Sequence, residues 1–244
     1  MQSVPVKKQT DRLTVLKVEM EQIINEEQTE FVKDANEIAL VETLKEKGEE
    51  ALAEYFMQNR NRLHRMISMR MDQRLAQRVD ASDVLQEGFV DAAKRIQEYV
   101  DNPSMPLFVW IRFLVGQKLA AVHRWHFNTQ KRDPRREELA ASQKMPTVDS
   151  QILAQEFSAS VTSPSEAVSK AEVTKKMLEV LETLEPMDRE ILVMRHFEEL
   201  SNNEAAAELE ITKGTASKRY VRALTKLNKA MAITGGSVPS IPKD

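Results

Sequence analysis

The chain has 244 residues, a formal net charge of −3, 30% charged residues, 6 glycines and no cysteine. The absence of cysteine excludes disulfides and thiolate metal sites and fits a reducing cytoplasm, where we expect the protein. No signal-peptide core is present, and no apolar run approaches the roughly 20 residues that span a bilayer, so we expect no membrane insertion. Scarce glycine and aromatic residues with abundant charge favour an all-α chain.

The small net charge hides a strong segregation along the chain. Lys and Arg outnumber Asp and Glu by six in residues 51–136 and by three in 201–234. Acidic residues exceed basic ones by five in residues 1–50, by two in 137–176 and by five in 177–200. Two basic islands separated by acidic ones are typical of a protein that contacts a polyanion at two places. Charge alone does not distinguish this from solvated helix faces.

Residues 1–48 are predicted to form an acidic helical extension. Apolar residues recur at helical spacing from Leu13 through Ile38, Val41 and Leu44, and Gly48 ends the pattern. One hypothesis is that residues 10–47 fold against the neighbouring basic surface and restrain it. The alternative is that this helix only extends the core of the next domain.

Residues 49–136 are predicted to be a helical domain. A helical stretch to about Arg78 offers Leu52, Phe56, Leu63, Ile67 and Met71 for a core. Asp80 is suited to cap an amphipathic helix that continues to Ile96. Two prolines make 101–106 a loop, and 107–127 is a half-buried helix with a basic end.

The rest of the chain is predicted to hold a polar linker and a second small domain. Residues 137–170 are the linker, with a short helix at 150–157, and 235–244 form a disordered tail. In 171–234, a helix from Met177 to Leu184 precedes one that begins at Pro186, with Asp188 near the positive end of the helix dipole. Ser201 and Glu204 have the spacing of a capping box.

The last two helices have the layout of a helix-turn-helix. A short helix to Leu209 and a brief turn precede a basic helix that Thr212 can cap. The start of the second helix fits the major groove, while basic residues further along neutralise phosphates. Val221, Leu224 and Leu227 are expected to face the core. The predicted DNA-binding residues are Lys213, Gly214, Thr215, Ser217, Lys218, Arg219 and Arg222.

These segments resemble a known family. Residues 184–227 (LEPMDREILVMRHFEELSNNEAA to ELEITKGTASKRYVRALTKL) are similar to the promoter-reading domain of bacterial sigma factors. DASDVLQEGFVDAAKRI (80–96) and FVWIRFLVGQKLAAVHRWHF (108–127) resemble the polymerase-docking and promoter-melting helices of the sigma-70 family. The compact arrangement is similar to the extracytoplasmic-function class. The resemblance covers about residues 50–232.

The resemblance implies a transcription initiation factor without a catalytic site or cofactor. Its partners would be promoter DNA and core RNA polymerase, docked through the clamp helices of the largest subunit; whether an anti-sigma factor also binds is left open. Asp80, Asp83, Gln86 and Glu87 match the docking motif. The C-terminal helix-turn-helix would read the minus-35 element.

A second set of residues would read the minus-10 element. The loop 101–106 lies where the family captures a flipped base, and Trp125 is suited to stack on a base, a contact worth about 1–3 kcal/mol. Trp110, Phe113 and Leu114 are expected in the core. The predicted minus-10 residues are Asn102, Ser104, Lys118, His123, Arg124 and Trp125.

Three residues depart from the family pattern. Ala206 replaces a larger aliphatic residue, Glu210 replaces a common turn glycine, and Gly88 replaces a bulkier residue within a helix, at a cost of about 1 kcal/mol relative to Ala.

Other residue patterns in the sequence point to other classes of function. His123 and His126 have a spacing that suits a metal, but their surroundings are basic and no third ligand lies nearby, so no metal site is predicted. Asp80, Asp83 and Glu87 lack the glycine loop or nucleophile–base pair of an enzyme. A helix-turn-helix repressor or activator that works without polymerase is the main alternative. A purely structural helical adaptor is the third.

Overall fold

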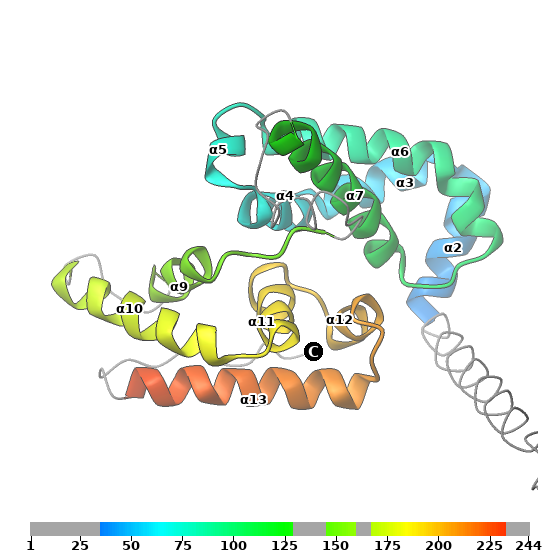
Figure 1. The fold of residues 1–244 in the computed structure, drawn as a ribbon. Coiled ribbons are helices and arrows are strands. Elements are labelled where there is room, and N and C mark those ends of the chain that lie inside the picture. Colours follow the sequence, from blue (N-terminus) through cyan, green and yellow to red (C-terminus); the bar gives the residue numbers. More distant parts are fainter. Residues whose placement is uncertain (1–34, 129–144, 160–166, 233–244) are drawn as a thin grey trace, which may run out of the picture.

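A computed structural model describes residues 35–128, 145–159 and 167–232, and every regular element in these ranges is helical, which confirms the all-α prediction. In Figure 1 the helices form two layers, one above the other. The upper layer is the N-terminal half (residues 35–128), and the lower layer is the C-terminal half (residues 145–232). Within the described ranges, none of the helices combines the length and apolarity needed to cross a lipid bilayer.

The N-terminal half is built around the pairing of its two longest helices. Helix α6 (Ala81–Asp101) packs along α7 (Leu107–Asn128). A Cβ at Gly88 would lie 2.6 Å from Val115 Cγ2, which shows how closely the two helices approach. The glycine that departs from the family pattern is therefore required by the packing, whatever it costs in helix propensity. The elements of this half are α2 (Ala35–Lys47), α3 (Glu49–Gln58), α4 (Arg60–Arg70), α5 (Gln73–Ala76), α6 (Ala81–Asp101) and α7 (Leu107–Asn128).

The helical stretch predicted from residue 49 to about 78 consists of three helices. The first two meet at Asn59, which ends α3 and precedes α4, and an extended residue at Met71 ends α4. Despite these breaks, all five predicted core residues of this stretch are buried. The apolar spacing identified the core, but it did not show where the chain turns.

Helix α2 belongs to the core of the N-terminal half. Val41 and Leu44 are buried, and a carboxylate oxygen of Glu37 accepts a hydrogen bond from the amide of Leu107, the first residue of α7, at 3.2 Å. The described part of the N-terminal extension therefore extends the first domain's core, as one of the two alternatives predicted. Residues 1–34 lie outside the described part, so the restraining role proposed for 10–47 is not tested there.

The C-terminal half begins with a hairpin of two helices that pack closely on each other. Phe157 of the first is fully buried and makes ring contacts with His196 and Phe197. The short helix expected at 150–157 is present, and the helix expected from Met177 begins ten residues earlier. The elements are α9 (Ser150–Ala159), α10 (Ala167–Thr183), α11 (Pro186–Leu192), the π-helix η1 (Val193–Phe197), α12 (Asn202–Glu208) and α13 (Lys213–Ala232).

Two residues expected in the core are exposed. Phe113 and Val221 retain 44% and 48% of their surface, whereas Trp110 and Leu114 are buried as predicted. Each lies on a helix whose apolar stripe is wider than the surface its neighbours cover. The expectation was wrong because periodicity shows which face of a helix is apolar and not how much of that face is packed.

Candidate nucleic-acid interface

The helix-turn-helix is formed by α12 and α13, and the predicted caps hold both helices in place. The Ser201 hydroxyl accepts from the amide of Glu204 at 3.1 Å, and the Glu204 carboxylate accepts from the amide of Ser201 at 2.7 Å. Thr212 Oγ1 accepts from the amide of Thr215 at 3.2 Å, which confirms the predicted cap of α13. The turn between the helices passes through Glu210 at φ 52°, a left-handed conformation that usually requires glycine.

Helix α13 divides sharply into a buried and an exposed face. Ala216, Tyr220, Ala223, Leu224 and Leu227 are buried, so one stripe fixes the helix to the domain. The other face is exposed along its length at Thr215, Ser217, Lys218, Val221 and Arg222. Most predicted DNA-binding residues therefore lie on an accessible surface, and Val221 adds an apolar group that the sequence interpretation had assigned to the core.

Two of the predicted DNA-binding arginines are held by an acidic residue of α11. Arg219 Nη1 donates to Asp188 Oδ1 at 2.7 Å, and Arg222 Nη2 donates to Asp188 Oδ2 at 2.7 Å. Arg219 also donates to the Glu185 carboxylate at 3.0 Å. The Asp188 side chain is 1% exposed, against 25% for Arg219 and 50% for Arg222. From sequence, Asp188 had been assigned only to the helix dipole; its pairing across 31 to 34 residues had no local signal.

The predicted docking residues lie at the start of α6. Asp80 caps this helix, because its Oδ1 accepts from the amide of Ser82 at 2.7 Å, and this hydrogen bond lowers the pKa of the Asp80 carboxyl. Asp83, Gln86 and Glu87 are exposed. Val90, one turn further along, is also exposed, at 43%. The exposed face of α6 is therefore polar and charged in its first two turns and apolar at Val90, a combination suited to a protein partner.

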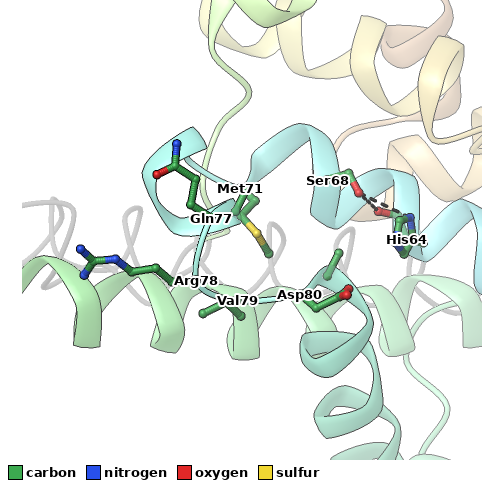
Figure 2. A pocket seen from close by; sticks show the side chains of 9 residues that line it. His64, Ser68, Met71, Gln77, Arg78, Val79 and Asp80 are labelled. Atoms are coloured by element: carbon green, nitrogen blue, oxygen red, sulfur yellow. Dashed lines mark hydrogen bonds between the residues drawn. The ribbon is translucent and has the colours of Figure 1, made fainter.

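An open pocket of about 390 Å³ borders the same helix start (Figure 2). It lies where α4, the short α5 and the beginning of α6 meet, and Asp80 forms part of its wall. The Ser68 hydroxyl donates to the carbonyl of His64 at 2.9 Å beside it. The pocket is lined by His64, Ser68, Met71, Ala76, Gln77, Arg78, Val79, Asp80 and Ala81.

The predicted minus-10 residues lie around α7 and the loop before it. The Tyr99 hydroxyl donates to the carbonyl of Met105 at 3.0 Å, which fixes the loop so that Asn102 and Ser104 are exposed. Trp125, near the other end of α7, is 68% exposed and contacts the ring of His126 edge-on. The loop and the tryptophan are thus accessible but lie toward opposite ends of α7.

The remaining minus-10 candidates are half-buried. Lys118 pairs with Asp91 at 2.8 Å, which partly neutralises its charge. Burial lowers the pKa of His123. Arg124 is of intermediate exposure. In the described ranges, no three His, Cys, Asp or Glu side chains come together as ligands for a metal ion.

Comparison with known proteins shows what part of the C-terminal half is similar to. Residues 174–227, from within α10 to the last buried leucine of α13, match the family model "Sigma-70, region 4". The match covers less than half of the chain. Over 55 residues the chain is 36% identical to the RNA polymerase sigma-E factor of Streptomyces coelicolor and 34% identical to that of Streptomyces avermitilis. These matches cover 22% of this chain and 31% of each relative, so the chain spans about a third of the curated relatives' length.

Among solved structures, the chain is similar to one titled "Structure of CnrH in complex with the cytosolic domain of CnrY". The likeness covers 82% of this chain and 99% of that one, at 20% identity and a TM-score of 0.44. The resemblance to the sigma-70 family is confirmed for residues 174–227, which contain α12 and most of α13. The roles of single residues on the surface of this segment remain predictions.

Proposed function

We propose that this chain is a sigma factor of the extracytoplasmic-function class, which binds core RNA polymerase and directs it to specific promoters. The observation that carries the proposal is the region 4 match over residues 174–227, together with the exposed basic face of the helix-turn-helix in that region. In this role the protein binds and positions other molecules, and no catalytic residue or cofactor is needed.

The first proposed surface is the exposed face of α13, which reads the minus-35 duplex. Ser217 and Lys218 are near its start and point to solvent, where a helix laid in the major groove presents donors to base edges. Arg222, half exposed, lies one turn further along and is suited to a phosphate. Arg219 is only 25% exposed, whereas Lys218 is exposed, so we assign Arg219 a smaller direct share in binding than Lys218.

The second and third proposed surfaces lie on the N-terminal half. The exposed loop residues Asn102 and Ser104 and the exposed ring of Trp125 contact the opened minus-10 strand. Asp83, Gln86 and Glu87 on α6 dock on the clamp helices of the polymerase's largest subunit, where acidic and amide groups meet basic ones. Val90 extends this surface with an apolar contact.

Reconstituted transcription tests the proposal. Core RNA polymerase is incubated with a promoter library, with and without this protein, and the transcripts are sequenced. We expect a set of start sites that appears only with the protein and shares upstream sequence elements. Operator binding by the protein alone, without any new transcript, would instead support a repressor or activator that does not dock on polymerase.

Matched variants then separate the surfaces. Lys218→Ala should reduce use of promoters with a strong upstream element, and Lys229→Ala, exposed near the far end of the same helix, is its control. A combined Gln86→Ala and Glu87→Ala variant should weaken polymerase binding and leave binding to a minus-35 duplex unchanged. Normal transcription with both variants would overturn the surface assignments while leaving the protein's class intact.

A further inference from the structure

A buried cluster of charged side chains joins the two halves of the chain. Glu198, which follows η1 in the C-terminal half, is fully buried. Its Oε1 accepts from Arg70 Nη2 of α4 at 2.7 Å, and its Oε2 accepts from Arg112 Nε of α7 at 2.9 Å. The two arginine side chains are each 1% exposed. Arg70 also pairs with Glu190, and Arg112 with Glu208.

A third arginine, Arg62, makes further contacts between the halves beside this cluster. Arg62 of α4 donates to the backbone carbonyls of Glu198 at 3.3 Å and Glu199 at 3.0 Å, and to the Glu204 carboxylate at 3.0 Å. Its guanidinium also stacks on the ring of Phe108, 3.6 Å from the centroid. Arg62 therefore bridges α4, α7 and the segment between η1 and α12.

The charges at this contact are complementary and almost completely separated by half. The three arginines come from the basic N-terminal half, and the carboxylates come from the C-terminal half. Glu190 and Glu198 belong to its acidic portion 177–200, and Glu204 and Glu208 follow that portion. Burial alone would raise the pKa of Glu198, but Arg112 and Arg70 outweigh it and lower that pKa, so the group stays ionised. Each charge thus gives up water only in exchange for a partner in the other half.

Such a contact is stable while every charge has a partner, and it is destabilised when one of the charged side chains is removed. Removing one partner of a buried ion pair leaves an uncompensated buried charge, which destabilises the contact. If the halves separate, water solvates that charge and the destabilisation is relieved. The side-chain hydrogen bonds of Glu198 run to Arg70 and Arg112, both in the other half. Its loss therefore bears on the contact between the halves rather than on the fold of either.

We propose that Glu198, with Arg70 and Arg112, is an ionic latch that holds the two halves closed, and that the chain opens when this latch is broken. The latch pairs positive charges of the basic island 51–136 with negative charges of the acidic island 177–200. The sequence interpretation had assigned the basic island to contact with a polyanion. The inference deepens the proposed function, because two promoter elements are read together only if the halves can adjust their separation.

Energy transfer between two dyes tests the latch. The chain contains no cysteine, so Met57→Cys on α3 and Glu182→Cys on α10, both exposed, give each half a single thiol for dye attachment. Glu198→Gln keeps the shape of the side chain and removes its charge. We expect lower transfer efficiency and an open-to-closed ratio that rises about 10- to 100-fold, since hydrogen bonds to charged groups contribute about 1.5–3 kcal/mol.

Two more variants keep the test decisive. Glu98→Gln removes an exposed carboxylate that pairs with Arg95 within α6, and it should leave the transfer efficiency unchanged. Arg62→Gln weakens the surrounding contact without emptying the buried cluster and should open the chain to a smaller extent. Circular dichroism confirms that helix content is kept. Unchanged efficiency in both Glu198→Gln and Arg62→Gln would overturn the latch.

The measurement uses neither polymerase nor DNA, so it is independent of the proposed function. If Glu198→Gln opens the chain but the transcription assay fails, the latch stands and the sigma-factor role falls. If transcription succeeds and the efficiency does not change, the reverse holds.

Discussion

The described part of the chain contains two clusters in which one carboxylate bonds two arginines, and the clusters differ in what they connect. At the first, Glu198 meets Arg70 and Arg112 between the halves, and all three side chains are excluded from water. At the second, Asp188 meets Arg219 and Arg222 within the C-terminal half, and only the carboxylate is buried. In each cluster one carboxylate bonds two guanidinium groups, which come from α4 and α7 in the first and both from α13 in the second.

The difference in exposure indicates a difference in role. A fully enclosed cluster offers nothing to a ligand until the halves part, so it acts on the arrangement of the chain. A half-exposed cluster leaves guanidinium surface in solvent while one side of each group is fixed, so it presents the arginines in a set orientation. The same pairing therefore serves closure in one place and presentation in the other.

The largest predicted effect is at the enclosed cluster. Glu198→Ala removes the buried carboxylate that Arg70 and Arg112 share and should lower the free energy of unfolding by about 3–5 kcal/mol, or by the full strength of the contact between halves if that is smaller. A triple variant, Arg70→Met, Arg112→Met and Glu198→Leu, should lose less stability, because packed apolar groups replace the central ion pairs and the carboxylates left without arginines, Glu190 and Glu208, are 21% and 20% exposed. Chemical denaturation measures both. Equal losses in the two variants would contradict this account.

A smaller effect is expected at the half-exposed cluster. Asp188→Asn should cost about 1–3 kcal/mol in the free energy of unfolding, since the buried side chain loses its charged bonds. It should also weaken binding to a minus-35 duplex, because Arg219 and Arg222 lose their orientation. Simple electrostatics predicts the opposite sign, since an acid near DNA is removed. Fluorescence anisotropy measures the affinity, with Glu185→Gln as the control: that carboxylate is 65% exposed, and its loss should not weaken binding.

Two glutamates have a left-handed backbone conformation, one beside the enclosed cluster and one in the helix-turn-helix. Glu199 (φ 58°) follows η1 beside the enclosed cluster, and Glu210 (φ 52°) follows α12 in the helix-turn-helix. Glycine adopts this conformation without the steric cost of about 1 kcal/mol or more that a side chain meets. Glu199→Gly and Glu210→Gly should therefore each raise the melting temperature. The gain at 199 should be slightly smaller, because its exposed side chain also lies 3.7 Å from Arg65. A destabilised Glu210→Gly variant would show that the side chain has a stabilising contact.

Local features of both halves could be predicted from the sequence. The caps at Asp80, Ser201 and Thr212, the helix start at Pro186 and the helix-turn-helix itself depend on residues within a few positions of each other. Apolar spacing likewise identified Leu52, Leu63 and Ile67 as core. Such features are determined by near neighbours, which the sequence contains directly.

The two charge clusters could not be predicted in the same way. Glu198 lies 128 residues from Arg70 and 86 from Arg112, so no spacing rule connects them. The segregation of charge along the chain was visible, and it was interpreted as a surface for a polyanion. Part of that charge instead pairs inside the molecule, and which part depends on how the halves pack. The closeness of α6 and α7 had one local sign, Gly88, whose cost in helix propensity was visible while its reason was not.

The smallest predicted effect separates capping from docking at Asp80. Its carboxylate accepts from the amide of Ser82, and its pKa is lowered in the folded chain, so its contribution to stability is present above its unfolded pKa of about 4 and is lost as the pH falls through the lowered value. The amide signal of Ser82 in a ¹⁵N–¹H NMR titration should follow this transition. Asp80→Asn keeps a capping oxygen, because Asn caps helices about as well as Asp, but it removes the charge. We expect the titration to disappear with little loss of stability. If polymerase binding is also unchanged, Asp80 serves α6 alone, and docking depends on Asp83, Gln86 and Glu87.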